Sequence, residues 1–247
     1  MDETIIWKYF GEGEISGFTL VIPSVAVGNV GQLACDLLIS SFNMVKLASI
    51  YDTALIPILG YDPYDLNSSK LSTCCEVYKC IQRNLIVLQF RAPLVYKYAQ
   101  RFLNEVVKKF KEKNVKEVVI LTSSFAHVNK HISSSPFRFV ANELYSYKNK
   151  IISLKWIEHE LHDTGLQIYG GGFASLLYQI CTEQLLPCLV LYKYCSEGNN
   201  IPDAYEMIHY LANLLPLFSE KTDLKSQLLE PVSWKLLFGR PPPSDIY

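Results

Sequence analysis

The sequence predicts a single α/β domain with a mixed, mostly parallel sheet flanked by helices. Short apolar runs rich in β-branched residues alternate with segments whose apolar residues recur at helical spacing. Glycine-containing turns at residues 28–31 and 170–172 each lead from an apolar run into a helical pattern, as in strand-to-helix connections. No repeat, composition break or linker divides residues 1–247, so we expect one domain with a C-terminal tail at residues 231–247.

The first half of the chain opens with a strand, a glycine turn and a helix. Residues 18–22 form a short apolar run that ends at Pro23, and apolar residues from Val30 to Leu38 then fall on one helical stripe. This is the first half of a βαβ unit. Further strands are predicted at residues 46–51, 74–80 and 85–90, the last two as a hairpin, with a long loop at residues 60–69.

The second half contains the clearest helix, at residues 94–113. Its apolar residues Ala99, Phe102, Leu103, Val106, Val107 and Phe110 share one face. A strand at residues 117–121 then leads into a serine-rich loop at residues 122–136. More strands are predicted at residues 151–157, 166–169 and 189–194, and more helices after the glycine run at 170–172 and at Pro202.

Composition and charge exclude several classes of protein. Hydrophobic residues make up 49% of the 247 residues and charged residues 19%, which is typical of a globular chain. The net charge of −1 gives no electrostatic basis for binding nucleic acid. No apolar run approaches the ~18 residues of a membrane span, and residues 1–4 lack the character of a signal peptide. We expect no nucleic acid or membrane partner and a location in the cytosol or the nucleus.

The cysteines and histidines do not predict a metal site. Seven cysteines, an odd number, occur without any Cys-x-x-Cys pair, so in a reducing compartment they are most simply small apolar residues. His159, Glu160, His162 and Asp163 lie close together in the sequence, but such a group in a polar segment is more often surface. We therefore expect no metal.

The turn at residues 26–31 is the best candidate for a cofactor site. Ala26-x-Gly28-x-x-Gly31 differs from the dinucleotide fingerprint only at its first glycine, and Asp52 ends the next strand where a ribose-binding acid would lie. The three residues from Pro23 separate the strand from this turn, which loosens the geometry needed to bind a pyrophosphate. We favour the alternative, that the glycines allow close backbone packing, and expect no cofactor.

Two further segments carry candidate chemistry. Gly170, Gly171 and Gly172 could form an anion-binding nest, although a tight strand-to-helix turn needs the same residues and is the favoured interpretation. Ser123, Ser124, His127 and His131 share one predicted loop. Because no Gly-x-Ser-x-Gly elbow is present, we expect no nucleophile and no catalytic residue.

The tail combines an apolar cluster around Trp234 with three consecutive prolines at residues 241–243. A stiff polyproline spacer suits the projection of Asp245, Ile246 and Tyr247 into a pocket of a partner protein. A frayed end is the alternative, and the residues alone leave both open.

Several blocks of sequence, in order along nearly the whole chain, match a known family. They are Gly17-Phe-Thr-Leu, Val27-Gly-Asn-Val-Gly-Gln-Leu-Ala, Ser135-Pro-Phe-Arg, Gly170-Gly-Gly, Ser196-Glu-Gly-Asn-Asn-Ile-Pro-Asp-Ala and Ser233-Trp-Lys-Leu-Leu-Phe-Gly. On these blocks the chain resembles the proteasome assembly chaperone 2 family. The resemblance implies an ATP-independent chaperone that is not an enzyme, with a fold similar to nucleoside-phosphorylase-like domains.

The resemblance also implies partners. Members pair with proteasome assembly chaperone 1, and the heterodimer promotes assembly of the α-subunit ring of the 20S proteasome and prevents off-pathway ring dimers. Related chaperones dock a hydrophobic-tyrosine-X tail between α subunits, whereas in this sequence no residue follows Tyr247. The alternative function is a nucleotide-binding or nucleoside-processing α/β enzyme built on Gly28, Gly31 and Asp52.

Overall fold

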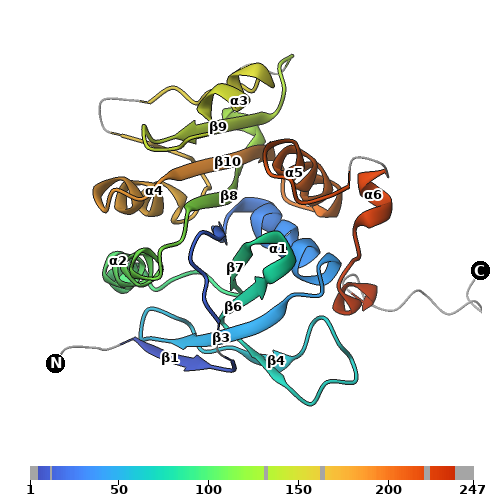
Figure 1. Cartoon of the computed structure of the whole chain (residues 1–247). Coiled ribbons are helices and arrows are strands. Elements are labelled where there is room, and N and C mark those ends of the chain that lie inside the picture. Colours follow the sequence, from blue (N-terminus) through green and yellow to red (C-terminus); the bar gives the residue numbers. More distant parts are fainter. Residues whose placement is uncertain (1–4, 12, 131–132, 162–164, 220–222, 237–247) are drawn as a thin grey trace, which may run out of the picture.

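An eight-stranded mixed sheet with helices on both faces forms the centre of the molecule (Figure 1). The computed structural model describes residues 5–11, 13–130, 133–161, 165–219 and 223–236. The strand order is β1-β3-β6-β7-β2-β8-β10-β9, and the four neighbours β7, β2, β8 and β10 run parallel. The predicted single α/β domain is confirmed, with the parallel part of its sheet at the centre.

The strands of this sheet are short and largely buried. Their bounds are β1 (Ile6–Tyr9), β2 (Thr19–Pro23), β3 (Val45–Tyr51), β6 (Cys75–Cys80), β7 (Leu85–Phe90), β8 (Glu117–Phe125), β9 (Phe137–Ala141) and β10 (Cys188–Cys195). The β6–β7 pair is the predicted antiparallel hairpin, and its turn uses the left-handed Asn84. A separate two-stranded ribbon, β4 (Leu59–Tyr61) and β5 (Leu71–Thr73), lies below β3 in Figure 1.

Two layers of helices cover the sheet, each with its own hydrophobic core. Helices α1 (Val30–Ser41) and α5 (Ile201–Leu214) pack on one face, and α2 (Tyr96–Glu112) and α4 (Ala174–Glu183) on the other. All six residues of the predicted apolar face of α2 are buried, and Asn114 follows the helix in the left-handed conformation. Two short helices, α3 (Lys148–Ser153) and α6 (Leu224–Gln227), lie in the connections.

Several sequence-based assignments are wrong. Residues 151–157 were predicted as a strand, but residues 151–153 belong to helix α3, and residues 166–169 form no strand. Residues 122–124 were predicted to start a solvated loop, yet they continue β8 and are buried. Strands β1, β4, β5 and β9 were also not predicted, and β9 carries the buried Arg138. This buried guanidinium donates to the carbonyl of Phe137 at 2.7 Å and to the hydroxyl of Ser134 at 3.1 Å.

Candidate functional site

The two glycine turns meet at the carboxyl ends of the parallel strands. Residues 24–29 leave β2 at this edge, and the loop at residues 168–173 crosses it before α4 begins. The amide of Val27 donates to the carbonyl of Gly170 at 3.0 Å, and the amide of Phe125 donates to that of Tyr169 at 3.2 Å. In open α/β sheets this edge is the usual place for a ligand. Here the chain's own backbone crosses it.

A row of buried hydroxyls fixes this crossing. The Ser24 hydroxyl donates to the Gly171 carbonyl and accepts from the Phe173 amide, both at 2.8 Å. Thr122 donates to the same carbonyl at 3.0 Å, and Ser124 donates to the Tyr169 carbonyl at 2.9 Å. The Ser123 hydroxyl donates to the carbonyl of Val27. These side chains hold one segment of backbone against another, and three of them, Thr122, Ser123 and Ser124, were predicted to lie in a loop.

Two glycines in these turns, Gly31 and Gly172, lie where a side chain would collide with backbone. A Cβ atom on Gly31 would lie 2.3 Å from the carbonyl oxygen of Leu121, where α1 packs on β8. A Cβ atom on Gly172, whose φ is 61°, would lie 2.1 Å from the carbonyl oxygen of Val25. Gly28 (φ 66°) and Gly170 (φ 81°) also adopt left-handed conformations. This geometry favours the packing interpretation over a phosphate-binding cradle.

Asp52, the acid expected to bind a ribose, has another role. Its carboxylate is buried and accepts from both terminal nitrogens of Arg101, at 2.6 and 3.0 Å. It also accepts from the amide of Ala54 at 2.8 Å. The oxygens that would receive ribose hydroxyls therefore already tie the end of β3 to helix α2.

Among the described residues, the other candidate catalytic side chains do not assemble into a nucleophile and base. The His127 ring stacks on Phe125 with centroids 5.2 Å apart, and Nδ1 of His159 hydrogen-bonds the Tyr192 hydroxyl at 2.6 Å. His131, His162 and Asp163 lie outside the described residues. In the ranges that the structure describes, no three His, Cys, Asp or Glu side chains are placed to hold a metal ion.

The cysteines are buried free thiols. Burial raises the pKa of the thiols of Cys35, Cys75 and Cys188, which disfavours the reactive thiolate. Within the described part of the chain, no helix is both long and apolar enough to cross a bilayer.

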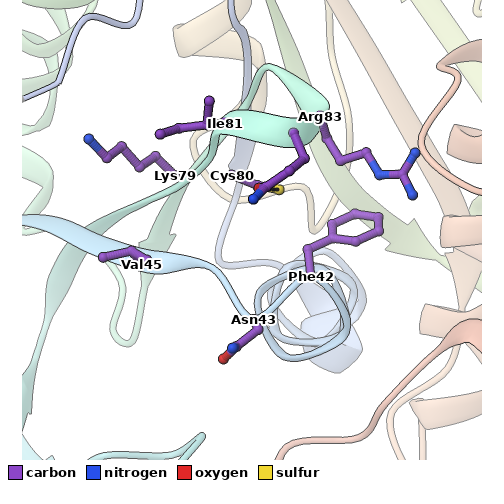
Figure 2. Close-up of a pocket in the computed structure, with 8 residues that line it drawn as sticks. Phe42, Asn43, Val45, Lys79, Cys80, Ile81 and Arg83 are labelled. Atoms are coloured by element: carbon purple, nitrogen blue, oxygen red, sulfur yellow. Dashed lines mark hydrogen bonds between the residues drawn. The ribbon is translucent and has the colours of Figure 1, made fainter.

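A groove of about 430 Å³ lies at the opposite edge of the sheet, beside the β6–β7 turn (Figure 2). Its volume is in the range of ligand-binding clefts. Phe42 and Ile81 line it together with Lys79 and Arg83, and Figure 2 shows these two cations pointing away from one another. The Arg83 guanidinium lies 5.6 Å from the centre of the Phe42 ring. The lining contains neither carboxylate nor histidine, so it offers no acid–base pair.

The C-terminal segment is described as far as Leu236. Trp234 is buried in the core beneath α1 and α5, and the amide of Ser233 donates to the carbonyl of Pro63 at 3.2 Å. The proposed docking residues Asp245, Ile246 and Tyr247 lie outside the described residues. Their role stays a prediction.

One functional candidate escaped sequence analysis. The predicted loop at residues 60–69 overlaps strand β4 and ends before strand β5, and the ribbon that these strands form has Leu59, Tyr61 and Leu71 exposed. The spacing of Leu59 and Tyr61 could have indicated a strand, but only the structure shows that their shared face is turned outward.

Comparison with known proteins gives consistent relatives over most of the chain. Residues 20–230 match the PAC2 family. A human protein named proteasome assembly chaperone 2 is 37% identical over 246 residues, covering 92% of this chain and 93% of its own. The zebrafish (Danio rerio) protein of that name is 36% identical over 90% of this chain and 92% of its own, and the Saccharomyces cerevisiae one is 26% identical over 89% and 94%.

Solved structures show the same fold at low sequence identity. PbaB, an archaeal proteasome activator from Pyrococcus furiosus, matches with a TM-score of 0.69 at 15% identity, covering 92% of this chain and 93% of its own. PbaA from the same organism, an archaeal homologue of proteasome-assembly chaperone, matches with a TM-score of 0.65 at 15% identity, over 87% and 90%. The likeness to nucleoside-phosphorylase-like folds stays a prediction. The resemblance noted in the sequence is confirmed, and the chain belongs to the PAC2 family.

Proposed function

We propose that this chain is a proteasome assembly chaperone that acts by binding other proteins and not by catalysis. The observation that carries the proposal is its full-length similarity to relatives named proteasome assembly chaperone 2, at 37% identity for the human protein. The carboxyl edge of the sheet supports it, because the Ser24 and Thr122 hydroxyls donate to the Gly171 carbonyl there and the Val27 amide donates to the Gly170 carbonyl, so these groups are used within the chain.

The finer part of the proposal concerns partners. The chain pairs with proteasome assembly chaperone 1, and the heterodimer binds α subunits of the 20S proteasome. It promotes assembly of the α-ring and prevents off-pathway ring dimers, in the cytoplasm and the nucleus. Family membership supports this assignment.

Co-expression tests the proposal directly. The full chain is expressed with proteasome assembly chaperone 1 and examined by gel filtration, then mixed with purified α subunits. We expect a one-to-one complex that retains α subunits. A monomer that ignores both the partner chaperone and the α subunits would overturn the proposal.

The nucleotide-binding alternative makes the opposite prediction in a second experiment. Calorimetric titration with NAD(P), ATP and nucleosides should give no heat of binding, because the Asp52 carboxylate is already paired with Arg101. Saturable heat that disappears in an Asp52→Asn variant would favour the enzyme. We expect Asp52→Asn to lower the stability of the fold and to leave the calorimetric titration without a heat of binding, as for the wild type.

A further inference from the structure

Exposed apolar side chains are concentrated in residues 6–81, which include strands β1 and β3 and the β4–β5 ribbon at one end of the sheet. Of the nineteen large apolar side chains exposed among the described residues, twelve belong to residues 6–81, and the other seven are spread from Tyr96 to Leu229. This end holds β1, β3 and the β4–β5 ribbon (Figure 1). Typical monomers expose no apolar patch above ~300–600 Å².

The ribbon has an outward apolar face, which we call the ribbon face: Leu59, Tyr61 and Leu71. Tyr61 lies opposite Leu71 in the antiparallel register, and Leu59 is two residues before Tyr61, so all three point to the same side. Their exposed fractions are 67%, 87% and 49%. The other side carries Gly60 and the buried Ser72, which are opposite one another. The ribbon is therefore polar inside and apolar outside.

A buried carboxylate holds the inner side of the ribbon. Glu76 on β6 is 1% exposed and accepts from the hydroxyl of Ser72 at 2.7 Å and from the amide of Thr73 at 3.0 Å. Lys46 on β3 pairs with Glu76 and also donates to the carbonyl of Leu71 at 2.9 Å. These bonds tie β5 to the main sheet and fix the orientation of the ribbon face.

A second buried charge holds the loop between the two ribbon strands. The Tyr64 hydroxyl donates to Asp36 on α1 at 2.6 Å and accepts from Arg91 at 2.8 Å. Arg91 in turn pairs with Asp36 at 2.9 Å. The segment at residues 59–73 is thus anchored to the body of the protein at Tyr64 in its loop and at strand β5.

The sheet is also left open at this end. At its other end, the edge of β9 is covered by residues 157–159, with the Phe139 amide donating to Ile157 at 3.1 Å and the His159 amide donating to Phe139 at 2.8 Å. No described strand pairs with the outer edge of β1, which carries the exposed Ile6 and Tyr9. An unpaired edge beside apolar side chains is a site for association.

We propose that the ribbon face is the centre of the surface that binds the partner chaperone subunit. This proposal rests on the proposed function. The ribbon face and the exposed Ile6 and Tyr9 of the unpaired strand β1 lie at the same end of the sheet and offer aromatic and aliphatic side chains of the kind that form the core of a subunit interface. Asp62 and Asp65 in the connecting loop oppose binding to an anionic membrane. The apolar composition suits a lasting interface between subunits.

The test uses the full chain and a matched pair of tyrosines. Tyr61→Glu changes the ribbon face, and Tyr96→Glu changes a tyrosine that is 95% exposed at the start of α2. We expect Tyr61→Glu to weaken the Kd for proteasome assembly chaperone 1 at least tenfold and the Leu59→Glu/Tyr61→Glu double variant to abolish co-elution. Tyr96→Glu should bind like the wild type. Melting temperatures within a few degrees of wild type would show that the variants fold.

Each result separates this inference from the proposed function. If both ribbon variants bind the partner chaperone with the wild-type Kd, the ribbon assignment alone is overturned. If the wild-type chain does not bind the partner chaperone, both proposals are overturned. Tyr61→Glu could instead abolish self-association or α-subunit binding while binding to the partner chaperone persists. That result would assign the ribbon face to another occupant and would also overturn the ribbon assignment. Hydrogen exchange gives an independent measurement, since amides of residues 59–73 should slow in the complex, and unchanged exchange there contradicts the proposal.

Discussion

Gly31 shows how a single missing Cβ sets the distance between a helix and a strand. Because its Cβ position is 2.3 Å from the Leu121 carbonyl oxygen, Gly31→Ala should push α1 away from β8. We expect the free energy of unfolding to fall by about 1–3 kcal/mol, as for other overpacked cores. Urea denaturation measures this, with Gly60→Ala as the control because its Cβ would meet nothing within 4 Å. Equal stability of the two variants would contradict the packing interpretation.

Glu76 should make stability depend on pH. Burial alone would raise the pKa of Glu76, but hydrogen bonds from Lys46, Tyr78 and Ser72 lower it below its usual value. A lowered folded-state pKa gives stability that is present above the unfolded pKa and is lost as the pH falls through the folded value. Glu76→Gln should therefore cost roughly 3 kcal/mol at pH 7, and less at acid pH.

Denaturation at a series of pH values between about 7 and 3 measures this effect, because model carboxyl groups titrate near pH 4. The exposed Glu105 on α2 provides the control, since Glu105→Gln should leave the pH dependence unchanged. A difference between wild type and Glu76→Gln that stays constant with pH would show that the carboxylate charge is not what anchors the ribbon.

At the scale of elements, the sequence predicted correctly those helices and strands whose apolar residues repeat at a regular spacing within the element itself. Helix α2 is correct because its apolar residues repeat at helical spacing and all become buried. Strand β9 was not predicted, and its only described strand partner, β10, is distant from it in the sequence, so no local pattern reveals the pairing. The apolar pair Ile151 and Ile152 suggested a strand, but in helix α3 only Ile151 is buried and Ile152 is 61% exposed. Short apolar runs do not distinguish the two structures.

The segment at residues 59–73 should become more mobile when the Tyr64 hydroxyl, which anchors its loop, is removed. Tyr64→Phe deletes the hydroxyl that links Asp36 to Arg91, and we expect a cost of about 1–2 kcal/mol. Hydrogen exchange should accelerate at residues 59–73 while helix α2 is unaffected. Tyr96→Phe is the matched control. If exchange in the ribbon stayed at the wild-type rate, the ribbon would be held by the Glu76 contacts alone.

At the scale of the whole molecule, the candidate site depended on contacts between distant parts of the chain. The glycine turns were recognisable from sequence, but Ser24 bonds to Gly171, 147 residues away, and Asp52 to Arg101, 49 residues away. Local sequence patterns do not show that the hydrogen-bonding groups of such side chains are already paired within the chain. The family could be recognised because its blocks extend along the chain, whereas the outward face of the ribbon could be found only in three dimensions.

The tail and the ribbon face should act on different partners. Deletion of residues 245–247 removes the apolar and aromatic groups suited to a pocket between α subunits, but leaves the ribbon face and its anchors unchanged. We expect the deletion to weaken α-ring binding several-fold and to spare the heterodimer, while Tyr61→Glu does the reverse. Native mass spectrometry of both variants with proteasome assembly chaperone 1 and α subunits measures the two affinities separately. Unchanged α-ring affinity after the deletion would reject docking by this tail, and loss of the heterodimer would place these residues in the subunit interface.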